Sequence, residues 1–228
     1  MNRKIVLLAA ALLTASVCLA GTPRRSPNSP YQYGKRLYIA VQGGPMVSFS
    51  DNASSYAAND DFWGRFGLQG QLSIGYNFTD AFDIRLSGSY NRPAGALAPW
   101  GGFFPYRFNA YHLFADAIWD FNSMGENYVS FSPKVYVGVG AAYTDGYTDD
   151  KIEPAHSYQY TEGPNLVPGF RFGSIMEFDG KDGFGWFVDF GFEFFTDWYD
   201  GLSPATFPFD VDPKLSVGII YHLPRARK

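Results

Sequence analysis

Residues 67–90, GLQGQLSIGYNFTDAFDIRLSGSY, contain two runs in which apolar and polar side chains alternate. In the first run Leu68 and Ile74 share one parity, and mostly glutamine, serine and glycine occupy the other. The alternation stops at residues 79–81 and resumes from Phe82. Because successive side chains of a strand point to opposite faces, this period of two predicts two strands joined by a short turn. The two faces of this hairpin must meet different surroundings.

The same period recurs about eight times along the chain, over lengths that a tilted membrane strand needs. The other segments cover about 37–42, 111–121, 134–143, 166–177, 186–198 and 214–223. Short links near Asp80, Gly125 and Lys181 alternate with long links at about 49–66, 91–108, 145–164 and 197–212. Pro168 is the weakest point of this assignment, because proline cannot donate a hydrogen bond to a neighbouring strand. The sequence predicts an all-β fold, an eight-stranded antiparallel up-and-down transmembrane β-barrel.

The two faces of the predicted strands differ in size as well as in polarity, and size decides between two kinds of barrel. A soluble barrel such as a lipocalin would turn the apolar face inward, whereas a membrane barrel would turn it outward. The polar face is rich in glycine and serine, and eight strands enclose an interior only wide enough for side chains. The bulky aromatic residues of the other face would not fit there. We therefore expect the apolar face to meet lipid.

Charged and aromatic residues follow the same division. The charges within the alternating segments lie on the polar parity: Asp83, Arg85, Asp116, Asp120, Lys134, Arg171, Glu177, Asp189, Glu193, Asp197 and Lys214. Aromatic residues of the apolar face gather near the short links (Tyr76, Phe78, Phe82, Trp119, Phe121, Phe178, Trp186 and Tyr221) and near the long links (Tyr90, Tyr111, Tyr143 and Trp198). Two such girdles are typical of the two interfaces of a membrane.

The first residues, MNRKIVLLAAALLTASVCLAG, have the features of a secretory signal peptide. Arg3 and Lys4 give a basic start, an apolar run follows, and Ala20 precedes the expected cleavage point. We expect a signal peptide at 1–20, a flexible periplasmic leader at 21–35, the barrel at 36–223 and a short tail at 224–228. Cys18 is the single cysteine, so the mature chain would have no disulfide.

Composition argues against some classes of function. The 228 residues are 19% aromatic and only 18% charged, and their formal net charge is -4. Removal of the basic signal peptide makes the mature chain more acidic, and no basic patch interrupts it, so nucleic acid is not an expected partner. We expect no cofactor or metal, since the acidic stretch 148–153 lacks the spacing of a calcium-binding EF-hand loop.

The last strand carries the most specific motif. Ser216 is followed by Gly218, Tyr221 and the hydrophobic Leu223, in an order that resembles the assembly signal of small outer-membrane barrels. Over about 35–223 the chain resembles the OmpA-like outer membrane protein beta-barrel family of Gram-negative bacteria. This resemblance implies insertion by the barrel-insertion machinery and contact with outer-membrane lipid and lipopolysaccharide. Longer relatives carry a C-terminal peptidoglycan-binding domain, which we do not expect here.

Interior charges form a candidate cluster that consists of Arg85, Asp116, Lys134, Arg171 and Glu193. If the links turn about residues 125 and 182, Asp116 faces Lys134 and Arg171 faces Glu193, at the ~5 Å spacing of cross-strand neighbours. Because a charge in a confined lumen needs a partner or water, we predict that these pairs plug the barrel at mid-height. The alternative is a wet lumen in which each charge is hydrated separately.

The histidines do not favour an enzyme, although some eight-stranded outer-membrane barrels modify lipid A. His112 and His222 fall at opposite ends of the predicted lumen, and His156 lies in a long link. Aromatic residues of the long links could instead mark a contact site for an unknown extracellular ligand. These residues are Phe62, Trp63, Trp100, Phe103, Phe104, Tyr106, Tyr158, Tyr160 and Phe207.

The expected protein is therefore a monomeric, non-enzymatic outer-membrane barrel with a structural or surface-binding role. We expect its N-terminus and short turns in the periplasm and its long loops outside the cell. The main alternative is a small-diameter porin that passes small solutes.

Overall fold

The computed structural model describes residues 36–49, 66–79, 81–97, 104–121, 131–148, 159–160, 164–179, 183–196, 198–200, 202–203 and 209–223. The long strands are β1 (Arg36–Val47), β2 (Phe66–Asn77), β3 (Phe82–Arg92), β5 (Phe104–Asp120), β6 (Phe131–Thr148), β8 (Asn165–Asp179), β9 (Phe184–Thr196) and β11 (Phe209–His222). Three short strands accompany them, β4 (Ala94–Leu97), β7 (Gln159–Tyr160) and β10 (Leu202–Ser203). Within these ranges no helix is long and apolar enough to span a membrane.

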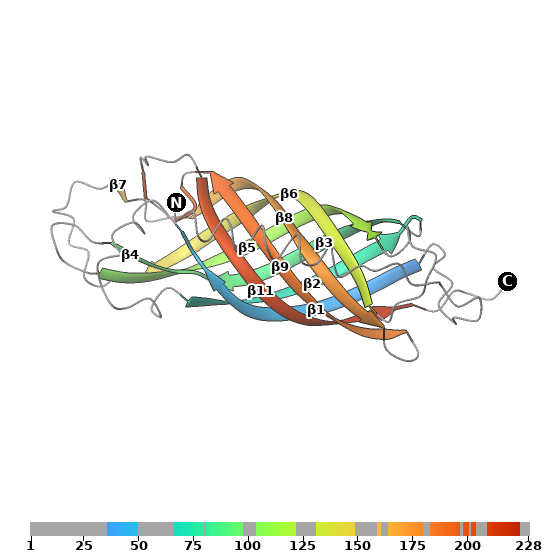
Figure 1. Ribbon diagram of the computed structural model, residues 1–228. Helices are drawn as coiled ribbons and strands as arrows, with labels where there is room; N and C mark the ends of the chain where they lie inside the picture. The colour runs from blue at the N-terminus through green and yellow to red at the C-terminus, as the bar shows by residue number, and fades with distance from the viewer. Residues whose placement is uncertain are drawn as a thin grey trace, which may run out of the picture.

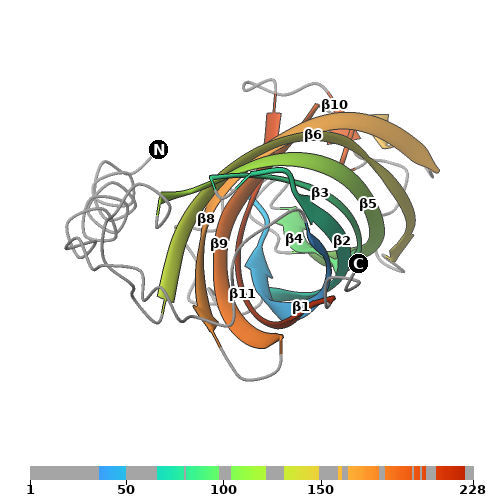
Figure 2. The same ribbon diagram turned by 90° about the vertical axis from the view of Figure 1, so that its right-hand side faces the viewer.

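The eight long strands close into a barrel (Figures 1 and 2). Each pairs antiparallel with the next long strand, from β1–β2 through β3–β5 to β9–β11. The first and last strands also pair, with Tyr38 opposite His222 and Gly43 opposite Val217. This closure pairs every long strand on both sides, which strands need in a medium without water. The predicted eight-stranded antiparallel up-and-down barrel is confirmed.

The two ends of the barrel differ. At one end, here called the short-turn end, residues 78–81 join β2 to β3, and the start of β1 lies beside them because Leu37 pairs with Tyr76. At the other end, here called the loop end, β4 extends the hairpin of β3 and β5, with Ala94 opposite Arg107. Figure 1 shows β4 and β7 at this end, on the left.

Some strands run further than predicted at the loop end. β5 begins at Phe104 and β6 continues to Thr148, so part of the long links expected at 91–108 and 145–164 is strand. Alternating hydrophobicity marks a strand only where its two faces meet different surroundings. The backbone pairing continues beyond that region, so the pattern ends before the strand does. Pro168 is accommodated within β8, since it pairs with Ala141 but lies one residue beyond Gly169, the last residue that pairs with β9.

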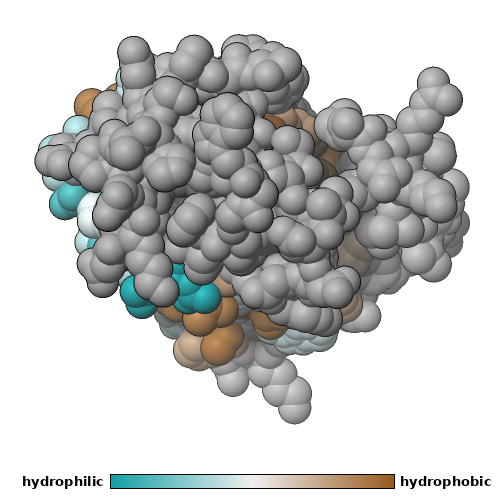
Figure 3. Space-filling model, turned by 90° about the vertical axis from the view of Figure 1, so that its left-hand side faces the viewer, coloured by the Kyte–Doolittle hydropathy of each residue, from teal (hydrophilic) through white to brown (hydrophobic). Residues whose placement is uncertain are grey.

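Burial alternates along the strands, with the apolar side chains outward. Val139 and Leu166 on the outer wall are 69% and 76% exposed, whereas Arg171 and Glu193 are each 1% exposed. The charged residues predicted for the polar face are all buried wherever their side chains are described, which leaves out only Asp197. Seen from the loop end, hydrophilic residues of the rim border hydrophobic residues of the wall (Figure 3). The barrel is therefore apolar outside and charged inside.

Aromatic side chains form rows near both ends of the outer wall. Near the short-turn end the rings of Phe82 and Trp119 lie 5.5 Å apart. Near the loop end Tyr111 lies between Tyr90 and Tyr143, with ring centroids 5.3 and 6.2 Å away. On β3, Phe82 and Tyr90 are separated by about 26 Å of strand. With the usual tilt of barrel strands, the wall between the rows is about 20 Å high, close to the apolar band of a membrane barrel.

The interior contains large side chains as well as the small ones expected there. One apolar cluster lies toward the loop end (Phe108, Ala110, Phe114, Ala142, Val167, Phe195 and Tyr199), and a second toward the short-turn end (Tyr38, Ala40, Ile118, Tyr136, Ile175, Phe187 and Ile220). The inward-facing glycines make room for these rings. A Cβ atom on Gly173 would lie 2.5 Å from the Tyr136 hydroxyl, and one on Gly191 would overlap the same hydroxyl. The large rings inside therefore occupy the volume that neighbouring glycines leave empty.

Candidate functional site

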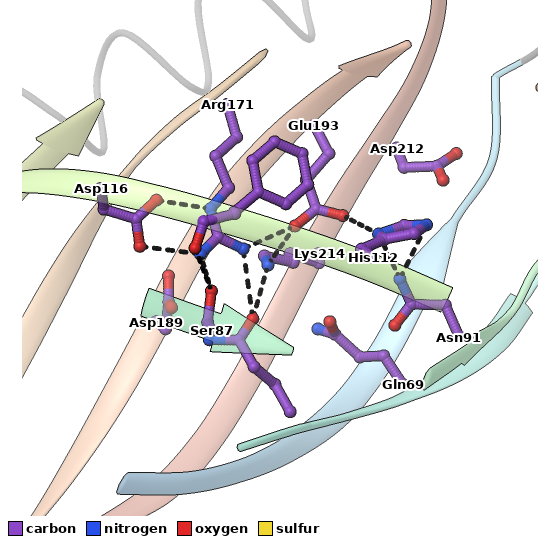
Figure 4. A network of polar contacts seen from close by, with 12 residues as sticks. Gln69, Ser87, Asn91, His112, Asp116, Arg171, Asp189, Glu193, Asp212 and Lys214 are labelled. Atoms are coloured by element: carbon purple, nitrogen blue, oxygen red, sulfur yellow. Dashed lines mark hydrogen bonds and ion pairs between the residues drawn. The ribbon is translucent and has the colours of Figure 1, made fainter. Parts of the chain in front are cut away.

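Arg171 on β8 is the centre of the polar contacts inside the barrel (Figure 4). Its Nε and Nη2 atoms lie 2.7 Å from the two carboxylate oxygens of Asp116, which is the two-point geometry of a strong ion pair. Its Nη1 donates to Oε1 of Glu193 at 3.1 Å and to Oε1 of Gln71 at 3.3 Å. Nη2 also donates to Oγ of Ser87. One guanidinium thus joins five strands.

Two of the contacts reach across the full width of the barrel. In the closed ring of eight strands β8 lies diametrically opposite β2, and the Arg171–Gln71 hydrogen bond joins them. Likewise β3 lies opposite β9, and Nη1 of Arg85 lies 3.7 Å from Oδ2 of Asp189. Because these contacts cross at mid-barrel, side chains occupy the centre of the lumen as well as its wall.

The charges at mid-barrel balance. The central network, as we call it, consists of Arg85, Arg171, Lys214, Asp116, Asp189 and Glu193. Within it Nζ of Lys214 lies 2.5 Å from Glu193, and Nε of Arg85 lies 2.7 Å from Asp116. Three cations therefore face three carboxylates, each cation within 4 Å of a carboxylate oxygen. Such complete pairing is what offsets the large cost of burying ions away from water.

Aromatic rings cover the guanidinium groups of this network. The Arg171 guanidinium carbon lies 4.4 Å from the centre of the Phe114 ring, and that of Arg85 lies 4.8 Å from the Tyr136 ring. A cation above an aromatic face is stabilised by the ring's electrons and shielded from water. Tyr136 also donates a hydrogen bond to Asp189 at 2.9 Å, so its ring covers Arg85 while its hydroxyl binds a carboxylate of the network.

A second group of charges, the short-turn cluster, lies nearer the other end of the lumen. Lys134 is 2.8 Å from Glu177 and 3.5 Å from Asp83, and Nε2 of His222 is 2.8 Å from Glu177. Asp120 also lies within 3.8 Å of Lys134. A cavity of about 20 Å³, large enough for about one water molecule, separates this cluster from Arg85 and the apolar side chains around Tyr38.

The structure brings together four of the five predicted cluster residues and separates the fifth. Arg171 and Glu193 are register partners, as expected from the turn between β8 and β9. Asp116 and Lys134 are not, since Asp116 pairs with Gly138 and Lys134 pairs with Asp120. The predicted Asp116–Lys134 pair is therefore wrong. The register between β5 and β6 is offset by four residues from the assumed one, because the sequence does not fix the centre of the link that joins them.

A residue of the loop end also enters the lumen. Tyr199 follows the end of β9, is fully buried, and donates a hydrogen bond to Asp212 at 2.6 Å. Its hydroxyl lies 3.1 Å from Nε2 of His112, whose Nδ1 lies 2.9 Å from Glu193. Burial, together with the neighbouring Asp212 carboxylate, raises the pKa of Tyr199 well above its usual value. The phenol therefore stays protonated and keeps donating.

The backbone before Tyr199 explains its direction. Trp198 has φ = 109°, in the left-handed region that residues other than glycine rarely adopt. We expected Trp198 to continue the strand, but β9 ends at Thr196. The alternation of aromatic residues in 186–198 hid this reversal, so the sequence carried no signal that Tyr199 would face inward. Gln71 and Ser87 were likewise not predicted to bind Arg171, although both are polar residues on the predicted inner face.

The predicted assembly-signal residues lie on both faces of β11. Ser216 faces the lumen and accepts a hydrogen bond from Gln69 at 2.6 Å. Tyr221 lies against Phe184, with 4.5 Å between ring centroids. The backbone nitrogen of Leu223 donates to the carbonyl of Leu37 at 2.9 Å, which continues the β1–β11 seam just beyond the strand. Gly218 pairs with Gln42 on β1.

Several predictions concern residues outside the described ranges. They are the signal peptide 1–20, the leader 21–35, the tail 224–228, His156, most of the acidic stretch 148–153 and most of the aromatic residues of the long links. Among the described residues, no group of three or more histidine, cysteine, aspartate or glutamate side chains is placed to hold a metal ion.

Comparisons with known proteins agree with the fold. No family model matches the chain, and no curated protein matches it in sequence. The solved structure of Neisserial surface protein A (NspA) is similar to it, with a TM-score of 0.52 and 12% identity, over 81% of this chain and 96% of that one. A major outer membrane protein from Thermus thermophilus gives a TM-score of 0.52 and 13% identity, over 84% and 100%. At these identities the similarity concerns the fold, which is that of small outer-membrane barrels.

Proposed function

We propose that the chain is an integral protein of the bacterial outer membrane, with a closed lumen and a structural or surface-binding role. The observation that carries the proposal is the inverted burial of the barrel. Leucine, valine and aromatic side chains cover the outer wall, while Arg171, Glu193 and the other charged residues predicted for the polar face are enclosed wherever their side chains are described. An exposed apolar surface of this extent is unfavourable in water and favourable against acyl chains.

The closed lumen is supported by the contacts that cross it. The Arg171–Gln71 and Arg85–Asp189 contacts span the barrel, and the two apolar clusters pack above and below them. A wide aqueous pore needs a larger barrel, since eight strands enclose little more than their own side chains. We therefore favour a protein that acts through its surface over a small-diameter porin. We also favour it over a lipid A-modifying enzyme, because the charged side chains of the lumen are buried in ion pairs.

The orientation, partners and biogenesis of the protein follow from the same proposal. Barrels of the outer membrane place short turns in the periplasm and longer loops outside the cell. The chain would therefore have its N-terminus on the periplasmic side and its loop end at the cell surface. Its resemblance to the OmpA-like family implies insertion by the barrel-insertion machinery, for which Ser216, Gly218, Tyr221 and Leu223 are the candidate signal. We propose a monomer, because the closed ring leaves no strand to share.

Conductance measurements test the closed lumen. In planar bilayers the wild type should show no steady channel, because the central network occupies mid-barrel. Glu193→Ala should raise conductance, since it removes the carboxylate between Arg171 and Lys214 and leaves the two cations to repel each other. Leu215→Ala, on the outer wall of β11, is the matched control and should remain closed. A large and steady wild-type conductance would instead support the porin.

Membrane insertion is tested separately by electrophoresis. Folded protein from the outer-membrane fraction should migrate differently in unboiled and boiled detergent samples, because the closed barrel resists unfolding by detergent until it is heated. Recovery of the folded protein as a soluble periplasmic species would contradict the proposal.

A further inference from the structure

In the described part of the strands, the exposed charged side chains lie in one region of the outer wall. Among the strand residues whose side chains the structure describes, the exposed charged ones are Arg92 on β3, Arg107 on β5 and Asp145 on β6. These three strands are neighbours in the barrel. A random scatter of three charges over eight strands would seldom place all of them on neighbouring strands and at the same end. The loop end of β3, β5 and β6 therefore has a distinct chemical character.

The two arginines lie within reach of a single anion. β3 and β4 pair with β5 in one continuous register, in which Asn91 faces Ala110 and Ala94 faces Arg107. This register places Arg92 opposite Asn109 and diagonal to Arg107, and diagonal neighbours on one sheet face are about 7–8 Å apart. Both guanidinium groups can therefore converge on one group between them.

The surface beside the arginines is suited to a lipid. One position toward the middle of the barrel lies the row of Tyr90, Tyr111 and Tyr143, with a hydrogen bond from the Tyr90 hydroxyl to Asn109 at 2.8 Å. Amphipathic rings of this kind favour the boundary between headgroups and acyl chains. Arginines just beyond such a row stand at headgroup level.

From the tyrosines toward mid-barrel, the wall carries small side chains around the exposed Leu113 of β5. The next outward positions are Gly88 and Ala141 on either side of Leu113, followed on β5 by Ala115 and Ala117. A Cβ atom on Gly88 would meet no atom closer than 4.0 Å, so the surface there is open. Small residues flanked by larger aliphatic ones leave a shallow strip in which an acyl chain can lie against the wall.

We propose that Arg92 and Arg107 bind the phosphate of a phosphorylated glycolipid in the leaflet at the loop end, with its acyl chains on the β5 strip. This inference rests on the proposed outer-membrane location and adds to it a specific lipid site with named residues. Guanidinium groups bind phosphate through paired, charge-assisted hydrogen bonds, and the same arginines would gain little from a zwitterionic headgroup. Asp145, at the level of Asn109, is the opposing charge that limits the affinity of the site.

Binding of diphosphoryl lipid A in maltoside micelles, followed by native mass spectrometry, tests the proposal. The double variant Arg92→Gln, Arg107→Gln should bind about 30-fold more weakly, since each basic residue contributes about fivefold at a membrane surface. Arg92→Lys, Arg107→Lys should stay within about fivefold of the wild type. Asp145→Asn should bind more tightly, because it removes a negative charge from the same rim. Lipid A without its phosphates should bind no better to the wild type than to the glutamine variant.

Three results would overturn the inference. They are equal binding by the wild type and the glutamine variant, equal binding of phosphorylated and dephosphorylated lipid, and full displacement of lipid A by excess inorganic phosphate, which would indicate a site for a free anion. All variants are first checked for the heat-dependent mobility of a folded barrel. A wild-type chain that fails this check contradicts the proposed function, whereas a folded barrel without phosphate preference contradicts the lipid site alone.

Discussion

At the scale of single residues, Arg171 contacts side chains of four other strands in the lumen. Its guanidinium holds Asp116 and Glu193 from two different strands and rests on the Phe114 ring. A buried carboxylate that loses its cation keeps the cost of its desolvation without the compensating attraction. Loss of Arg171 should therefore destabilise the barrel more than loss of an outward-facing side chain on the same strand.

Replacement of Arg171 by methionine tests this dependence. Arg171→Met should lower the free energy of unfolding by about 3–5 kcal/mol, because Asp116 and Glu193 each lose one of two cations and the remaining Arg85 and Lys214 face three buried carboxylates. Phe172→Met on the opposite face of the same strand is the control and should cost no more than about 1.5 kcal/mol. Urea titration of the protein in lipid vesicles, followed by tryptophan fluorescence, measures both values. Equal values for the two variants would show that the pairs inside are dispensable.

At the scale of the strands, glycines decide which rings can lie inside. Gly173 on β8 and Gly191 on β9 are register partners, and both stand beside the hydroxyl of Tyr136. The ring of Tyr136 can therefore cross toward Asp189 without meeting a side chain at either of these two positions. Because the barrel is closed, the inner faces of β8 and β9 lie beside the inner face of β6. Their glycines can therefore make room for a side chain of β6.

Gly191→Ala should be destabilising for this reason. Its methyl group would overlap the Tyr136 hydroxyl, and overpacking of a well-packed interior costs about 1–3 kcal/mol. Gly70→Ala on the outer face of β2 is the matched control, since nothing lies within 4 Å of its added Cβ and its stability should change by less than about 1 kcal/mol. Vesicle unfolding curves of both variants give the comparison. A Gly191→Ala protein as stable as Gly70→Ala would argue that Tyr136 moves freely.

At the scale of the whole molecule, the height of a residue on the outer wall should decide the cost of a charge there. Val139 pairs with Ala115 and Phe170 near the middle of the apolar band, whereas Leu166 pairs with Tyr143 in the row near the loop end. Both are highly exposed, so neither substitution disturbs the interior. Any difference between them would come from the surrounding medium.

Arginine substitutions at these positions test the membrane placement. Val139→Arg should cost about 2–4 kcal/mol and Leu166→Arg only about 0–1 kcal/mol, as expected at the centre and at the edge of a bilayer. Unfolding in vesicles measures both, and each variant must first show the mobility of a folded barrel. In water the two substitutions would cost equally little, so equal stabilities would contradict the proposed membrane band.

The sequence determined the wall of this barrel. A period of two, with glycine, serine and charge on one parity and bulk on the other, is a property of each strand by itself, and it fixed which side faces out for residues such as Val139 and Arg171. It also located the Arg171–Glu193 pair, because β8 and β9 join through a short link that leaves little choice of register.

Only the tertiary structure decided which interior groups meet. Closure of the ring places β8 opposite β2, so Arg171 reaches Gln71, a residue 100 positions away that no local pattern connects to it. The tertiary structure also set the register between β5 and β6, which separates Lys134 from Asp116. It likewise set the backbone turn that directs Tyr199 into the lumen. The physical reason is that strand periodicity sets the direction of a side chain, whereas its partner depends on register and on curvature, which belong to the closed sheet as a whole.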